Sequence, residues 1–87
     1  DIAIVIDEAV AVQAICDCVR QRGGELLRAV RLFDDYRGKE VPKGRKSLAL
    51  GLILQDFSRN LTDHVVEETV AGIIAGLTEQ FDATLRV

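Results

Sequence analysis

Residues 47–55 read Ser-Leu-Ala-Leu-Gly-Leu-Ile-Leu-Gln, and this stretch decides the fold. Leucine stands at every second position, which is the period of a β-strand with one face in a hydrophobic core. The leucines of that face are Leu48, Leu50, Leu52 and Leu54. The alternate positions are small or polar, apart from one isoleucine: Ser47, Ala49, Gly51, Ile53 and Gln55. The strand therefore predicts a sheet that is covered on one face and open on the other.

The chain upstream of this strand predicts a strand, a helix and a second strand. Residues 1–6 are short and rich in β-branched side chains, which favours a central strand. Residues 10–22 carry apolar side chains at the spacing of an amphipathic helix, namely Val12, Ile15, Cys16 and Val19. Gly23 and Gly24 are expected to end that helix, because glycine adopts the left-handed cap conformation at low cost. Residues 26–36 then predict the second strand.

The remaining segments complete the order of elements. Residues 37–45 predict a hairpin loop, since they contain two glycines and the only proline. Residues 56–61 predict a turn, and Thr62 is a good N-cap for a second helix. The apolar stripe of that helix is Val66, Val70, Ile73, Ile74, Leu77 and Phe81. Residues 83–87 predict a short last strand.

The resulting order is βαββαβ within a single domain, residues 1–87. Right-handed crossovers place both helices on one face of a four-stranded antiparallel sheet. The predicted fold class is therefore α+β, with the ferredoxin-like topology.

Composition excludes several classes of protein. The net charge is −3 and 48% of the residues are hydrophobic, which is typical of a soluble domain and not of a disordered tail. The longest uncharged stretch, residues 69–78, is too short to span a membrane. Methionine is absent even at position 1, so we expect a fragment of a longer polypeptide. Cys16 and Cys18 point to different sides of a helix, so a disulfide between them is not expected. The two cysteines and His64 are too few ligands for a zinc site. Reduced thiols and a cytoplasmic location are therefore expected.

Charge is unevenly distributed along the chain. Residues 36–46 hold five cations and one anion, a net charge of +4. Residues 61–82 hold five anions and neither lysine nor arginine. A basic hairpin beside an open sheet face suits an RNA backbone. The alternative interpretation is an ordinary solvated loop.

Two aromatic residues lie on or beside the second predicted strand. Phe33 or Tyr36 on an open sheet face would stack an unpaired base. Alternatively, one or both complete the hydrophobic core. Strand parity favours the core for Tyr36, because it alternates in step with Val30 and Leu32, although a bulge would reverse this assignment.

No catalytic or metal-binding constellation is evident. Asp34 and Asp35 are adjacent on a strand and should point to opposite faces, so they cannot converge on one substrate. His64 and its acidic neighbours are expected to be solvated. The chain has no phosphate loop and no nucleophile beside a base. Gly72 and Gly76 are expected to allow close approach of the second helix to the sheet.

Four spaced motifs carry a resemblance to a known family. They are Leu-Phe-Asp-Asp-Tyr-Arg-Gly-Lys at 32–39, Gly-Arg-Lys-Ser-Leu-Ala at 44–49, Leu-Gln-Asp at 54–56 and Arg-Asn-Leu-Thr-Asp at 59–63. With the first and last predicted strands, they make the chain resemble the ferredoxin-fold anticodon-binding domain, which ends the β subunit of bacterial phenylalanyl-tRNA synthetase. The resemblance covers essentially the whole chain.

The resemblance implies a function and a set of partners. The family enzyme is an α2β2 heterotetramer that joins phenylalanine to its tRNA with ATP and Mg²⁺, and catalysis belongs to its α subunit. The terminal β domain grips the anticodon stem-loop, so no catalytic residue and no cofactor is expected in this chain. The residues expected at the RNA are Phe33, Tyr36, Arg37, Lys39, Arg45, Lys46, Ser47 and Ala49.

The chain departs from the family pattern at two places, and two other functions stay open. The segment before the first strand is missing, and Asp35 replaces an apolar residue, which adds an anion beside the expected RNA surface. One of these functions is that of a small-molecule regulatory or dimerisation domain of the same topology, which would bind amino acids at a dimer interface and would need a Gly-rich loop after the first strand. An acylphosphatase-type enzyme would need an anion-binding arginine there. Residues 7–10, Asp-Glu-Ala-Val, provide neither.

Overall fold

A computed structural model of the chain describes residues 2–55 and 62–86. Its four strands form one antiparallel sheet in the order β2-β3-β1-β4. The strands are β1 (Ile2–Asp7), β2 (Leu27–Tyr36), β3 (Arg45–Leu54) and β4 (Thr84–Leu85). The expectation that the first strand is central is confirmed, because β1 pairs with both β3 and β4.

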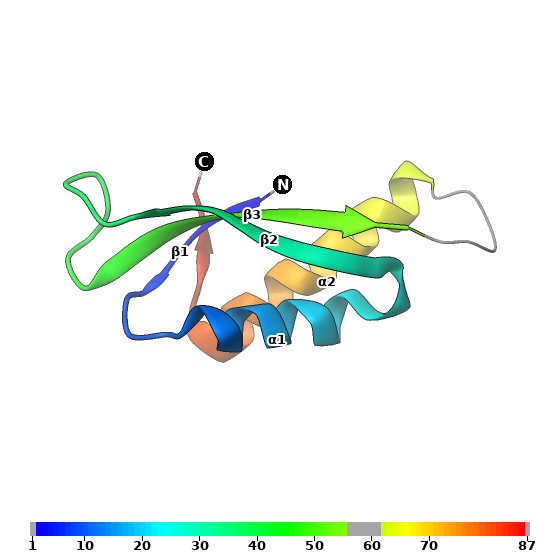
Figure 1. The fold of residues 1–87 in the computed structure, drawn as a ribbon, viewed down its shortest axis with the longest axis horizontal. Helices are drawn as coiled ribbons and strands as arrows, with labels where there is room; N and C mark the ends of the chain where they lie inside the picture. The colour runs from blue at the N-terminus through cyan, green and yellow to red at the C-terminus, as the bar shows by residue number, and fades with distance from the viewer. Residues whose placement is uncertain (1, 56–61, 87) are drawn as a thin grey trace.

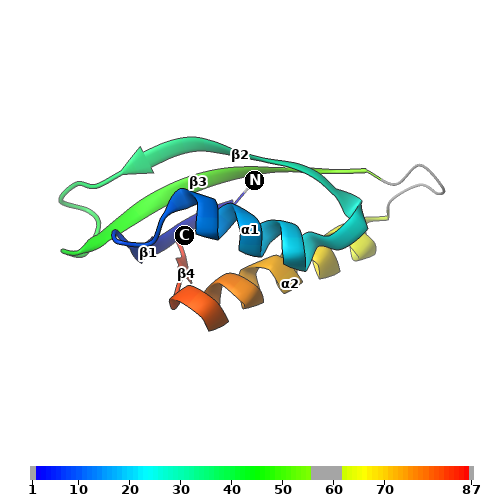
Figure 2. The same ribbon diagram turned by 60° about the horizontal axis from the view of Figure 1, so that its bottom comes forward.

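The two helices, α1 (Val12–Gly23) and α2 (Asp63–Phe81), lie side by side on one face of this sheet (Figures 1 and 2). The predicted ferredoxin-like α+β architecture is therefore confirmed. The predicted N-cap also forms, since the Thr62 hydroxyl accepts a hydrogen bond of 3.2 Å from the backbone N–H of Val65. Helix α1 ends at the two glycines as expected, and Gly24 has a φ of 61°.

The hydrophobic core lies between the sheet and the helices. Among the described residues, its largest fully buried side chains come from β1, β3 and the two helices: Ile4, Ile6, Ile15, Val19, Leu48, Leu50, Ile73 and Leu77. Cys18 is buried in the same core, whereas Cys16 is half-buried, and both thiols are free. Burial raises the pKa of the Cys18 thiol, so it is uncharged at neutral pH.

The observed boundaries of some elements differ from those expected. Strand β3 begins at Arg45 instead of residue 47, so the hairpin loop is shorter than predicted. Strand β4 has only two residues instead of the five expected at 83–87. The predicted turn at 56–61 lies outside the described residues. The early start of β3 matters most, because it places Arg45 and Lys46 of the predicted basic hairpin in the sheet.

Strand β2 contains a bulge that changes which face its side chains occupy. Leu32 is opposite Leu50, but Asp34 is opposite Ala49, so Phe33 is an extra residue. Tyr36 is consequently opposite Ser47 and not on the core face, which corrects the parity argument. Strand parity also implies that Leu32 lies in the core, and this is only partly right, because Leu32 on this edge strand is 40% exposed.

The two glycines of α2, Gly72 and Gly76, were expected to face the sheet, but Gly76 instead faces α1. A side chain at Gly76 would collide with the Arg22 side chain of α1, whereas an added Cβ at Gly72 would meet no atom within 4 Å among the described residues. The expected close approach to the sheet is therefore wrong. Over residues 2–55 and 62–86, neither helix is long and apolar enough to cross a membrane.

Candidate nucleic-acid interface

The candidate interface lies on the sheet face that the helices leave uncovered. Residues directly opposite in antiparallel strands share a face. Leu48 is opposite Ile4 on the core face, whereas Ser47 is opposite Val5 and Ala49 is opposite Ala3. The register of β3 therefore places Ser47 and Ala49 on the open face. The bulge brings Tyr36 to the same face, beside Ser47.

Tyr36 belongs to a group of residues that we call the Tyr36 cluster: Tyr36, Gly38, Glu40, Ser47 and Arg86. The Arg86 guanidinium carbon lies 5.7 Å from the centroid of the Tyr36 ring. Nη1 of Arg86 donates to the Ser47 hydroxyl at 3.0 Å, and its Nη2 donates to Glu40 Oε2 at 3.2 Å. An added Cβ on Gly38 would collide with the Tyr36 hydroxyl and ring. The cluster thus fixes an aromatic ring and a guanidinium group together on the open face.

Gly38, Glu40 and Arg86 belong to this cluster but were not among the residues expected at the RNA. Arg86 follows directly on β4, and its backbone N–H donates to the Ala3 carbonyl at 2.8 Å. Alternation places Arg86 on the open face once the pairing of β4 is known, because Thr84 is opposite Val5 on that face and Arg86 lies two residues later.

Phe33 lies at the bulge and is 63% exposed, the largest exposure among the large hydrophobic residues that the structure describes. The interpretation of Phe33 as part of the core is therefore wrong. A ring so exposed on an edge strand is available to a partner, which is the property that base stacking requires.

Arg37 is exposed but engaged in an ion pair. Its Nε and Nη2 donate to the two carboxylate oxygens of Asp35 at 3.2 and 3.3 Å. Hydrogen bonding to Arg37 lowers the pKa of the Asp35 carboxyl, and the same bond raises the pKa of Arg37. Asp34 and Asp35 lie on opposite faces as expected, because they are opposite Ala49 and Leu48 respectively.

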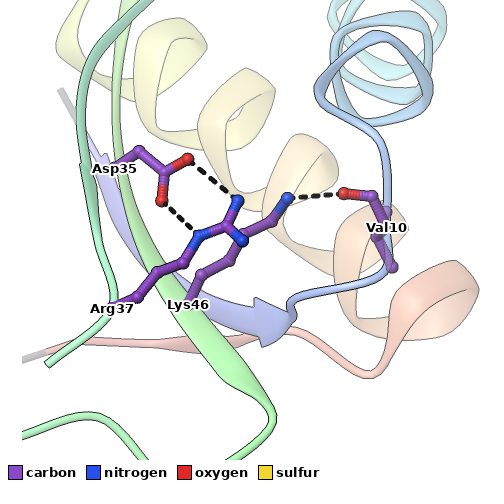
Figure 3. A network of polar contacts seen from close by, with 4 residues as sticks. All are labelled: Val10, Asp35, Arg37 and Lys46. Carbon is purple, nitrogen blue, oxygen red and sulfur yellow. Dashed lines mark hydrogen bonds and ion pairs between the residues drawn. The ribbon is translucent and has the colours of Figure 1, made fainter.

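Lys46 is not an accessible cation of the hairpin, so its expected contact with RNA is corrected. It is opposite Ile6 on the helix face, is only 3% exposed, and its Nζ donates to the Val10 carbonyl at 2.6 Å (Figure 3). Arg45 is half-buried, and its Nη2 donates to the carbonyls of Val5 and Asp82 at 2.8 and 2.9 Å. Both side chains thus connect β3, through hydrogen bonds to backbone carbonyls, to β1 and to the segments before α1 and after α2.

Lys39 and Lys43 are the two exposed lysines of the loop between β2 and β3. Within residues 2–55 and 62–86, neither makes a hydrogen bond or ion pair. This loop projects beyond the ends of both helices (Figure 1). Its lysines are consequently accessible to a flexible polyanion.

The other candidates do not form a site. His64 pairs with Glu68 at 3.0 Å on the exposed start of α2. In the described part of the chain, no group of three or more His, Cys, Asp or Glu side chains is arranged to hold a metal ion.

Fold and site together define a ferredoxin-like domain with an open sheet face that carries an aromatic–arginine cluster and a basic loop. The family model for the ferredoxin-fold anticodon binding domain matches residues 1–86. The chain belongs to this family.

Several curated relatives bear one name, phenylalanine–tRNA ligase β subunit. The relative from Vibrio vulnificus (strain YJ016) is 48% identical over 86 residues, which are 99% of this chain and 11% of the relative. Those from Pseudomonas savastanoi pv. phaseolicola and Shewanella oneidensis are 44% and 42% identical, with the same shares covered. The chain therefore spans about a ninth of the length of these relatives.

Proposed function

We propose that this chain binds the anticodon stem-loop of phenylalanine tRNA as one module of a phenylalanine–tRNA ligase β subunit. The observation that carries the proposal is the Tyr36 cluster, held on the open sheet face beside a loop with two exposed lysines. Membership of the anticodon-binding family and the shared name of the relatives support the same function.

The proposed binding mode assigns different tasks to these residues. Phe33 and Tyr36 stack unpaired bases, since aromatic rings offer flat surfaces that any base can cover. Ala49 is small and leaves room for a base to approach β3. Ser47 is buried, and its hydroxyl acts by accepting a hydrogen bond from Arg86. Lys39 and Lys43 contact phosphates, which orients the RNA without reading its sequence.

Arg45 and Arg37 take indirect parts in this binding mode. Arg45 maintains the sheet through its two backbone carbonyl partners. The planar guanidinium group of Arg37 matches a phosphate, but in the free protein this group donates two hydrogen bonds to Asp35.

The proposed parent enzyme supplies the chemistry. It joins phenylalanine to tRNA with ATP and Mg²⁺, which act at the partner α subunit of an α2β2 heterotetramer. This module contributes tRNA binding and no catalytic group. The cytoplasm is the proposed location, which suits the two free thiols.

The test is titration of the chain with the anticodon stem-loop and with a stem-loop of scrambled loop sequence. The chain should prefer the cognate loop. Tyr36→Ala should weaken cognate binding by about 1–3 kcal/mol, the value of one stacked base. Tyr36→Phe keeps the ring and should bind nearly as well as the unchanged chain. Equal affinity for the two RNAs would contradict the proposal.

A further inference from the structure

The Asp35–Arg37 ion pair lies on the wrong side of the sheet for the proposed RNA contact. Asp35 is opposite Leu48, a core-face residue, whereas Tyr36 is opposite Ser47 on the open face. Figure 3 shows the Arg37 guanidinium turned to Asp35, and it shows the Lys46 side chain, which lies on the helix face of the sheet, reaching the Val10 carbonyl. The pair therefore draws Arg37 away from the Tyr36 cluster.

The pair also occupies the donors that a phosphate would use. Both hydrogen bonds come from one edge of the guanidinium, through Nε and Nη2, and both carboxylate oxygens accept. A phosphate and a carboxylate match this edge with the same two-point geometry, so they compete for it.

The pair is weak enough to be exchanged. The side chains of Arg37 and Asp35 are 50% and 33% exposed, and exposed ion pairs contribute little net free energy. Lys46 adds a further attraction for the Asp35 carboxylate. An incoming phosphate must displace this carboxylate before Arg37 can reach the open face.

We infer that Asp35 is an internal competitor that holds Arg37 off the RNA-binding face and thereby lowers the affinity of the domain for the anticodon stem-loop. The inference rests on the proposed function. It makes Asp35, and not only the cations, a determinant of RNA affinity.

The test is a double-mutant cycle of stem-loop affinity with Asp35→Asn, Arg37→Gln and the double variant, at one low salt concentration. Asp35→Asn should raise affinity about two- to five-fold, the range that an exposed ion pair allows. In the Arg37→Gln background the same change should have almost no effect, because the released arginine is absent.

Asp34→Asn is the matched control, since it removes the same charge from the adjacent residue on the open face. The change in stem-loop affinity caused by Asp34→Asn should be the same in the Arg37 and Arg37→Gln backgrounds. Thermal melts of every variant establish that folding is retained. In addition, the Arg37 Nε–H resonance in NMR spectra of the RNA-free chain should change on Asp35→Asn and not on Asp34→Asn.

Three results would overturn the inference. An equal gain in both Arg37 backgrounds would make Asp35 a simple repulsive charge. No change would show that the pair does not compete, and a loss of affinity would show that Asp35 orients Arg37 for RNA. Failure of the proposed function appears separately, as equal binding of cognate and scrambled loops by the unchanged chain.

Discussion

At the scale of single residues, the clearest determinant of the site is a missing side chain. Gly38 leaves the space that the Tyr36 ring and hydroxyl occupy. Gly38→Ala should therefore displace the ring and weaken stem-loop binding by up to the ~1–3 kcal/mol of one stacked base. The melting midpoint should change little, because Tyr36 lies outside the core. Paired titrations and melts check this, and unchanged affinity would show that the ring position is unimportant.

Phe33 separates binding from stability in the same way. Because the ring is 63% exposed, Phe33→Ala should cost well under the ~3–5 kcal/mol expected for a buried phenylalanine. If the ring stacks a base, the same change should reduce stem-loop affinity about ten-fold or more. Chemical denaturation and RNA titration give the two numbers. Unchanged affinity in the Phe33→Ala variant would show that this ring does not stack a base.

At the scale of elements, Lys46 acts as a connection between β3 and the start of α1. Lys46→Met should destabilise the fold by about 1–3 kcal/mol, because the Val10 carbonyl would lose its buried donor. Lys39→Met is the matched control on the exposed loop and should change stability by less than ~0.5 kcal/mol. Denaturant midpoints compare the two, and equal effects would contradict the assigned role.

The two glycines of α2 provide a second matched pair. Gly72→Ala meets no neighbouring atom and should stabilise the helix by up to about 1 kcal/mol. Gly76→Ala would place its Cβ 2.6 Å from Arg22 Cγ, and Arg22 also pairs with Glu79 at 2.7 Å. The gain in helix stability from Gly76→Ala should therefore be cancelled or reversed. Thermal melts of both variants check the difference, and equal stabilisation would show that Arg22 moves aside freely.

The elements were predictable because each has a strong local pattern, and the errors arise where non-local pairing decides. Alternating leucines identified β3, and the apolar stripes identified both helices. The face of Tyr36 was not predictable by parity, because an extra residue at Phe33 depends on the pairing with β3. Lys46 was assigned to the basic hairpin for a similar reason, since only pairing with β1 shows that β3 begins at Arg45. Arg86 was missed because its partners are far away in the sequence.

At the scale of the whole molecule, the uneven charge should govern how RNA binding responds to salt. The loop between β2 and β3 carries the exposed lysines, while α2 is acidic and lies across the other face. Replacing Lys39 and Lys43 with Ala should reduce the salt slope of binding by roughly 0.7 for each single-strand phosphate that a lysine no longer neutralises. Lys46→Met should leave the slope unchanged. Titrations at several salt concentrations check this. An unchanged slope in the double variant would show that the lysines of the loop do not contact RNA phosphates.

The bulge at Phe33 has a further consequence for the behaviour of the chain in concentrated solution. Strand β2 is ten residues long and forms an outer edge of the sheet, where unpaired backbone groups invite a second copy to add its own strand. The extra residue interrupts that row of donors and acceptors. The neighbouring carboxylates of Asp34 and Asp35 add repulsion between copies. The bulge that places Tyr36 on the open face thus also disfavours edge-to-edge aggregation of the sheet.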